Sequence, residues 1–205
     1  MIDTSVFLAT ECESKLADCF PQNVQQKFVT ITLEMIRESA EYFKGYKNPS
    51  RETRANHRRG FMENALQELG ASFPAISISI ENYGGDSGSY TMLESKGMRI
   101  TESKTERRDA PPRQANFRDD ILSSSQTNFF EEIIPQNGNL YGILVYRVNK
   151  NNIVPDYIGI GFPNFRNSGW AHYIDLLERF GENLSAHADD PIINSEVSLD
   201  IKLKR

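Results

Sequence analysis

Apolar residues recur at helical spacing in the first third of the chain. In residues 22–44 they fall at steps of three, four and seven residues, which places them on one stripe of an amphipathic helix. A second pattern of this kind follows Ser50, which is placed to cap a helix that runs to Leu69, with Gly70 as its C′ residue. A short segment that contains a glycine and a proline separates the two patterns. The spacing therefore predicts a helical N-terminal segment over residues 1–70 that contains a helical hairpin.

Later segments of the chain change to a period of two. Six of them have patterns typical of strands: residues 75–83, 89–94, 98–104, 140–148, 153–162 and 197–203. The first alternates isoleucine with polar residues, which predicts a half-buried strand. The second and third predict a hairpin with its turn at residues 95–97. The fourth is apolar on both faces, which is typical of a central strand.

Helical patterns separate the later strands. Residues 117–134 predict a helical segment, continuous or broken, and residues 170–180 predict an amphipathic helix closed by Gly181. Residues 105–116 contain two adjacent prolines and several charges, which predicts a mobile loop. The order of elements predicts an α+β fold, in which an N-terminal helical hairpin is followed by a mixed, largely antiparallel sheet of five to six strands with flanking helices.

Length and composition favour one folded domain. The chain has 205 residues, of which 39% are hydrophobic, and this is enough to bury a substantial core. We expect a single domain over residues 1–205, with a sheet-containing core in residues 75–205. No secretory signal is visible and the longest apolar stretch is too short to span a bilayer, so we expect a cytoplasmic protein that is not inserted in a membrane. Cys12 and Cys19 lie two helical turns apart, which predicts reduced thiols.

Positive charge is concentrated in two segments, although the net charge of the chain is −5. Residues 51–59 and 107–118 contain the arginines that would contact nucleic acid: Arg51, Arg54, Arg58, Arg59, Arg107 and Arg108. In the first segment, steps of three and four residues place three arginines on one helix face. Basic residues in the first turns oppose the helix dipole, so contact with phosphate would explain their presence. The alternative is that the neighbouring acids Glu52, Glu63 and Glu68 neutralise them.

Three residues near the predicted hairpin have the side chains that metal-dependent phosphodiester hydrolysis needs. If residues 98–104 form a strand, its period of two places Glu102 and Lys104 on one face, at the end of an apolar run. Asp86 precedes the first arm of the hairpin and could return beside Glu102. Two carboxylates close together bind Mg²⁺, and the metal ion and the amine can then polarise a phosphodiester. We therefore predict Asp86, Glu102 and Lys104 as catalytic residues, with Asp86 and Glu102 as ligands of Mg²⁺.

This arrangement resembles the restriction-endonuclease-like nucleases, which are named for an Asp followed by a Glu-x-Lys motif on a hairpin. Those enzymes also place a helix before the hairpin and a helix-strand pair after it. The resemblance covers residues 75–160. Gly85 stands where the family usually has a proline, and Ser103 stands where it commonly has an apolar residue. The resemblance implies a Mg²⁺-dependent nuclease that holds nucleic acid with its basic segments.

Other interpretations stay open at this point. The Glu-x-Lys residues can be a surface pair, and Glu94-Ser95-Lys96 matches the same motif at the predicted turn. A non-catalytic module could bind nucleic acid or protein through residues 51–59 and 107–118. Arg51 and His57 resemble the Arg-x(4–6)-His motif of the helical ribonucleases of toxin and defence systems, whose site would need both side chains in one cleft, across a homodimer. The sequence does not decide whether the chain is an enzyme.

Overall fold

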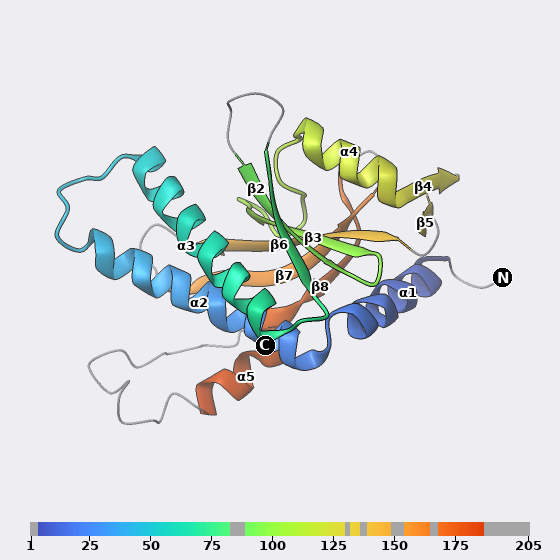
Figure 1. Ribbon diagram of the computed structural model, residues 1–205, viewed down its shortest axis with the longest axis horizontal. Helices are drawn as coiled ribbons and strands as arrows, with labels where there is room; N and C mark the ends of the chain where they lie inside the picture. Colours follow the sequence, from blue (N-terminus) through green and yellow to red (C-terminus); the bar gives the residue numbers. More distant parts are fainter. Residues whose placement is uncertain are drawn as a thin grey trace.

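The structure is a computed structural model that describes residues 4–82, 89–129, 132–135, 139–148, 154–164 and 168–186 (Figure 1). The helices are α1 (Thr4–Cys19), α2 (Gln22–Phe43), α3 (Arg51–Ser72), α4 (Asn116–Ser125) and α5 (Leu176–Ala186). The strands of the main sheet are β1 (Ser77–Asn82), β2 (Ser89–Ser95), β3 (Met98–Lys104), β6 (Leu140–Val148), β7 (Pro155–Pro163) and β8 (Trp170–Asp175). Two short strands, β4 (Gln126–Phe129) and β5 (Glu132–Pro135), lie between α4 and β6 in the sequence.

Six strands form one mixed sheet in the order β1-β2-β3-β6-β7-β8. Among the described strands of this sheet, β3 and β6 are the one parallel pair, and the other neighbours are antiparallel. A parallel pair needs a crossover connection, and α4 lies in the connection between β3 and β6. The short strands β4 and β5 pair only with each other within the described residues. This architecture confirms the predicted α+β class, with N-terminal helices followed by a mixed, largely antiparallel sheet.

Strands β2 and β3 form the predicted hairpin. Ser95 pairs with Met98 across a two-residue turn, in which Lys96 has a φ of 45° and Gly97 a φ of 80°. Left-handed conformations at both turn positions match the twist of the flanking strands. Met98 and Ile100 are both fully buried on one face of β3, so the alternation predicted for this strand is confirmed.

The sheet separates two apolar layers. On one face, which we call the helical face, α1, α2, α3 and α5 pack around side chains such as Phe28, Ile100 and Phe180. On the other face, which we call the α4 face, Ile121 of α4 packs with Tyr141 and other residues of β6 and β7. Helices α2 and α3 lie side by side as the predicted helical hairpin, and their connection projects away from the sheet (Figure 1). In the described part of the chain, no helix is long and apolar enough to cross a membrane.

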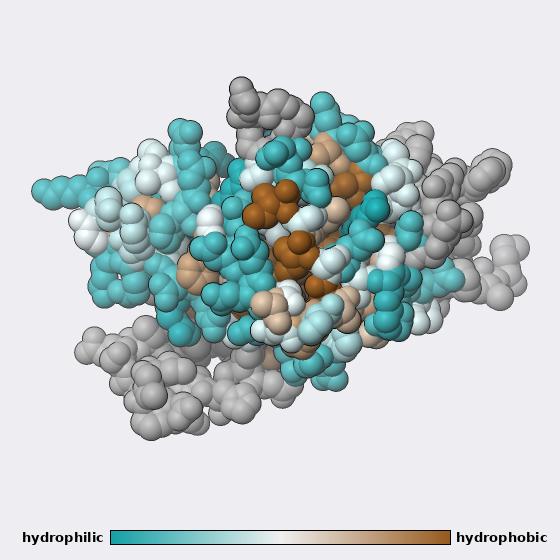
Figure 2. All heavy atoms as spheres, viewed as in Figure 1, coloured by the Kyte–Doolittle hydropathy of each residue, from teal (hydrophilic) through white to brown (hydrophobic). Residues whose placement is uncertain are grey.

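An apolar row lies at the edge of the sheet beside α3 (Figure 2). Ile76, Ile78 and Ile80 line a groove between β1 and α3, and 50% of Ile80 is exposed. The helix approaches the strand at Gly70, where a Cβ atom would lie 2.5 Å from Cδ1 of Ile78. Because α3 continues to Ser72, the prediction that Gly70 ends this helix is wrong, and the glycine instead allows close packing. No charged side chain lines the groove, so it offers nothing for acid–base or metal chemistry.

The predicted helix over residues 170–180 is wrong in its first half, which forms strand β8. A Cβ atom at Gly161 of β7 would lie 2.5 Å from the ring of Trp170, so the glycine makes room for the aromatic ring on the neighbouring strand. This packing favours a strand over a helix. Helix α5 begins only after Asp175, whose carboxylate accepts a hydrogen bond from the backbone N of Glu178 at 2.9 Å and caps the helix.

The predicted helical segment over residues 117–134 is helical only as far as Ser125. The strands β4 and β5 follow, and their sequences are rich in β-branched and aromatic residues, which favour strands. The strand predicted over residues 197–203 lies outside the described residues. Cys12 and Cys19 are buried free thiols, as the sequence predicts.

Candidate functional site

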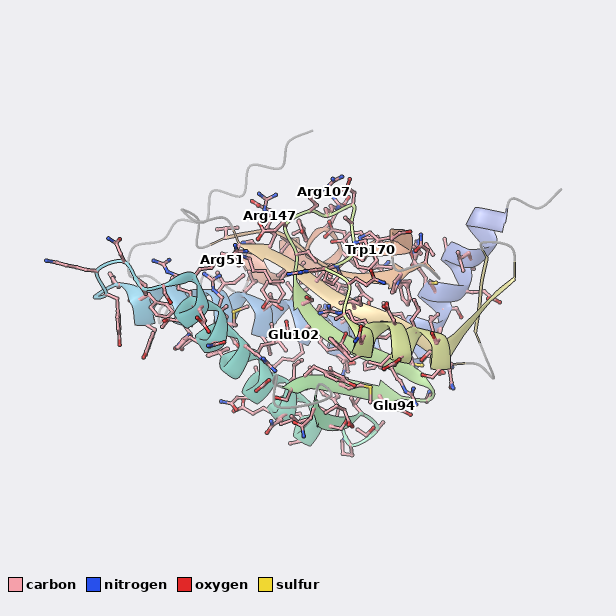
Figure 3. All side chains as sticks on the ribbon, turned by 90° about the horizontal axis from the view of Figure 1, so that it is seen from above. Arg51, Glu94, Glu102, Arg107, Arg147 and Trp170 are labelled. Carbon is pink, nitrogen blue, oxygen red and sulfur yellow. The ribbon has the colours of Figure 1, made fainter. Side chains whose placement is uncertain are left out.

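Glu102 and Lys104 project from the helical face of β3, as the alternation predicts. Glu102 as a residue is partly exposed, but its Oε2 atom is enclosed and has no hydrogen-bond partner. In Figure 3 Glu102 lies toward the middle of the molecule. An enclosed polar atom without a partner costs about 1–3 kcal/mol, and more when it is charged. Fold stability alone therefore does not explain a glutamate at this position.

Burial raises the pKa of Glu102 to about 7. The charges of Arg118 and Arg59 and a hydrogen bond from Tyr146 oppose this shift in the pKa, whereas the carboxylate of Glu63 adds to it. A carboxyl group whose pKa is close to 7 can exchange a proton at neutral pH, and a bound cation would hold it ionised. The surroundings of Glu102 therefore suit a chemical role better than a structural one.

Tyr146 belongs to β6, the parallel neighbour of β3. The register aligns Lys104 with Tyr146 and Glu102 with Leu144, so the cluster lies at the carboxyl ends of two parallel strands. Burial raises the pKa of Tyr146 well above its usual value, so the phenol stays protonated and can act as a hydrogen-bond donor toward Glu102. Ligands in sheets with parallel strands commonly bind beyond the carboxyl ends of those strands.

Lys104 is surrounded by more positive than negative charge. Burial lowers the pKa of its amine, and the carboxylate of Glu106, whose Oε1 lies 3.9 Å from Nζ, opposes that shift. The positive charges of Arg58 and Arg51 lower the pKa of Lys104 further. An excess of positive charge beside a partly buried amine favours the approach of an anion.

Helix α3 lies over this cluster and contributes two further arginines. Nε of Arg58 donates a hydrogen bond to Oγ of Ser39 at 3.2 Å. Arg59 donates to Oε1 of Glu63 at 3.1 Å and to Oγ of Ser89 at 3.3 Å. For Arg59, the alternative in which a neighbouring glutamate neutralises the arginine is therefore present in the structure.

Three residues of this cluster are not among those that the sequence predicts for the site. Glu63 has one signal in the sequence, because it stands four residues after Arg59 on the same helix. Arg118 belongs to the predicted basic segment 107–118, but its place near Glu102 depends on the position of α4. Tyr146 has no signal, because only the strand order brings it near Glu102.

Asp86 lies outside the described residues, so its predicted pairing with Glu102 stays a prediction. Ser89 is the first residue of β2, and continuation of the hairpin register places it opposite Lys104. Within the described ranges, no group of three or more Asp, Glu, His or Cys side chains gathers that could hold a metal ion. The Mg²⁺ site that the sequence predicts would therefore need Asp86 to complete it.

Comparison with known proteins gives this chain no relative. No protein family, curated protein or solved structure matches it. The resemblance to the restriction-endonuclease-like nucleases therefore stays a prediction from the sequence. The elements around the predicted motif follow the order α3, β1, β2, β3, α4, β4, β5 and β6.

The arginines predicted to hold nucleic acid have different surroundings. Arg51 is almost fully exposed, and one of its amino groups lies 3.6 Å from Oε1 of Glu106. The guanidinium of Arg54 lies 5.7 Å from the centre of the Phe43 ring. Arg107 pairs with Asp109 in the connection that follows β3. Arg51 is thus open to a phosphate group at the N-terminal end of α3.

Arg108 fixes the connection after β3 to the far edge of the sheet. Its guanidinium lies 2.8 Å from the carboxylate of Asp175, a side chain that is 13% exposed, and 5.2 Å from the centre of the Tyr173 ring. Nε1 of Trp170 donates a hydrogen bond to the backbone oxygen of Arg108 at 2.8 Å. Because its guanidinium already faces a largely buried carboxylate, Arg108 is less available to contact a phosphate than Arg51 is.

Arg51 and His57 do not face each other on α3. Six residues of helix separate them by about 9 Å along the axis and place them on different sides. The ring of His57 stacks on Tyr42, with 4.1 Å between the centroids, while Arg51 lies beside Glu106. Within one chain, these two residues therefore do not form the cleft that the helical-ribonuclease interpretation needs.

Proposed function

We propose that this protein is a Mg²⁺-dependent nuclease whose site lies around Glu102 and Lys104. The observation that carries the proposal is the enclosed Oε2 atom of Glu102, which has no hydrogen-bond partner and lies on the same strand face as Lys104, whose side chain is 36% exposed. A carboxylate oxygen without a protein partner can coordinate a cation, and Mg²⁺ prefers oxygen ligands. Bound there, Mg²⁺ would lower the pKa of a water molecule and offset charge on a phosphate.

The residues of the chain have separate tasks in this proposal. Glu102 would hold the cation, with Tyr146 orienting its carboxylate through the hydrogen bond from the phenol. Lys104 would stabilise the negative charge that develops on the phosphate oxygens. Arg58, which lowers the pKa of Lys104 through its charge, would add to the positive potential that attracts the phosphodiester.

The second ligand in this proposal is Asp86. It stands three positions before Ser89, and three residue steps of extended chain span at most about 11 Å. That length is sufficient for the Asp86 carboxylate to reach the end of β3, because Ser89 stands opposite Lys104 in the continued register. Glu63 is a further candidate ligand, since its carboxylate acts on the pKa of Glu102.

The test is cleavage of plasmid DNA and of RNA with Mg²⁺ or with EDTA, by the wild-type chain, Glu102→Gln and Glu94→Gln. The control substitution removes the glutamate of the Glu-Ser-Lys triplet at the turn of the same hairpin. We expect Mg²⁺-dependent cleavage that Glu102→Gln reduces on the order of 100-fold or more and Glu94→Gln leaves unchanged. Cleavage by Glu102→Gln at the wild-type rate would refute the site.

Metal binding can be measured without activity. We expect Mg²⁺ to raise the melting temperature of the wild-type chain at pH 8, and to raise that of Glu102→Gln much less. The specific observation that favours a non-catalytic nucleic-acid- or protein-binding module is that the described residues hold no group of three potential metal ligands. If neither DNA nor RNA is cleaved under any condition and Mg²⁺ does not change the melting temperature, the binding module would be favoured over the nuclease.

A further inference from the structure

Two exposed tyrosines lie at the end of the α2–α3 hairpin. Tyr42 is 51% exposed and Tyr46 is 53% exposed, whereas most large apolar side chains of the described residues are buried. Their rings stack on each other, with 5.5 Å between centroids and 23° between planes. The ring of His57 also stacks on Tyr42, at 4.1 Å and 25°. Three roughly parallel rings therefore line up at the surface, and we call Tyr42, Tyr46 and His57 the aromatic stack.

A buried ring holds the aromatic stack in position. Phe43 is 8% exposed and meets Tyr42 edge to face, with 4.9 Å between centroids. It makes similar tilted contacts with Tyr46 at 5.6 Å and with His57 at 5.2 Å. Edge-to-face contacts of this kind fix ring orientation. The exposed faces are thus presented on a supported base and do not need to be ordered when a ligand binds.

The segment around the stack is strongly basic. Residues 42–59 contain six basic residues and one acidic residue, a net charge of +5 in a chain whose net charge is −5. The basic residues are Lys44, Lys47, Arg51, Arg54, Arg58 and Arg59. Two of them have acidic partners in exposed pairs, Lys44 with Glu41 at 3.5 Å and Arg51 with Glu106 at 3.6 Å. Exposed pairs contribute little to stability, so phosphate groups can replace these partners at small cost.

We propose that the aromatic stack and the arginines beside it bind single-stranded nucleic acid. An unpaired base would stack on the exposed ring of Tyr46, which is an end ring of the aromatic stack, and the phosphates would contact Arg51 and Arg54. A duplex keeps its bases stacked on one another and presents no free base face to these rings. The proposal therefore distinguishes single strands from duplexes.

The direction in which the bound strand would run, from the aromatic stack to Lys104, rests on the proposed function. Oε1 of Glu106 lies 3.6 Å from Arg51 and 3.9 Å from Lys104, so Glu106 connects the end of α3 with the end of β3. A strand with a base stacked on Tyr46 can continue past Arg51 to Lys104. The aromatic stack would then act as the entry point of the substrate.

The test measures binding, not cleavage. The full chain with Glu102→Gln is titrated in EDTA against a fluorescent 12-nucleotide single strand and against the duplex of the same sequence. Tyr46→Leu, which removes the ring but keeps an apolar side chain, is expected to weaken single-strand binding roughly tenfold. Tyr46→Phe is expected to change it less than twofold. Ile80→Ala, which truncates a side chain that is similarly exposed on β1, serves as the matched control and should have no effect.

The inference is overturned if the duplex binds as tightly as the single strand, or if Tyr46→Leu binds like the parent. A dimer that Tyr46→Leu dissociates would also overturn it, because the rings would then be covered by a second copy of the chain. The two proposals fail separately. Single-strand binding in EDTA that depends on Tyr46, without any cleavage in Mg²⁺, would sustain the binding site and remove the nuclease.

Discussion

The chain contains the tripeptide Glu-Ser-Lys three times, and two of the copies stand at opposite ends of the same hairpin in different surroundings. Residues 94–96 lead into the turn, where Oε2 of Glu94 accepts a hydrogen bond from Nε of Arg99 at 3.1 Å. Residues 102–104 end β3, where Oε2 of Glu102 is enclosed without a partner. Figure 3 shows the two glutamates well apart along the hairpin.

Strand register is the cause of this difference. Glu94 is paired with Arg99 on the α4 face, whereas Glu102 is two residues after Ile100 on the helical face, under α3. Lys96 is a turn residue that binds Asp18 at the surface, and Lys104 is partly buried among arginines. The same tripeptide therefore supplies ordinary surface side chains at the turn. At the end of β3 its Glu and Lys have shifted pKa values.

The largest effect is expected when the lysines of the two triplets are replaced and the rate of cleavage is compared. We expect Lys104→Met to reduce Mg²⁺-dependent cleavage on the order of 100-fold, because it removes the charge that stabilises the phosphate while keeping most of the side-chain volume. Lys96→Met should cleave at the wild-type rate. Initial rates on a labelled substrate check both variants, and equal losses would mean that the two triplets do not differ in function.

The second effect concerns stability and pH. The pKa of Glu102 is about 7 in the folded chain, and its ordinary value, which the unfolded chain restores, is 4.5. The folded state therefore keeps a proton that the unfolded state releases between these values. Wild-type stability should therefore fall as pH rises through this window, and Glu102→Gln should not share that fall. At pH 8 we expect Glu102→Gln to be more stable than wild type by up to about 3 kcal/mol.

Urea unfolding at pH 4 and pH 8 measures this difference, with Glu94→Gln as the control. That control removes a partly exposed ion pair, so we expect a loss below about 1 kcal/mol at pH 8. A stability difference between wild type and Glu102→Gln that is the same at both pH values would show that the carboxyl group does not titrate as described.

A smaller effect is expected at the turn end of the hairpin. Gly97 has a φ of 80°, so Gly97→Ala should destabilise the fold by about 1–2 kcal/mol in urea unfolding. Lys96→Asn should be tolerated, since asparagine adopts the left-handed conformation readily. Neither change should alter cleavage at low temperature, because the turn lies at the opposite end of β3 from Lys104. A specific loss of cleavage in a folded Gly97→Ala chain would contradict this separation.

The smallest effect is expected for Asp18→Asn. This change removes the exposed partner of Lys96, which lies 2.6 Å away. Water and salt screen such a pair, so the melting temperature should change within the error of the measurement, and should not change at all in 1 M salt.

The sequence predicts the hairpin and one side of the site because both depend on local spacing. Alternation is enough to place Glu102 and Lys104 on one face of a strand, and Lys96-Gly97 is enough to mark the turn. The proximity of Tyr146 and Arg118 to Glu102 could not be predicted, because they reach Glu102 through a parallel strand pair and a crossover helix. The same limit explains the error at β8, where spacing fits a helix but glycines in β7 make room for a strand.

The contacts after Lys104 have one more consequence. The backbone N of Thr105 donates to the oxygen of Tyr146 at 3.0 Å, and its hydroxyl lies 2.8 Å from that of Tyr157. Three residues after Thr105, the backbone oxygen of Arg108 accepts a hydrogen bond from Nε1 of Trp170. The end of β3 is thus fastened to β6, β7 and β8, and these contacts oppose an outward swing of this segment. A ligand that bound here would meet a rim held in place beforehand, so we expect discrimination at this end to come from fit and not from closure.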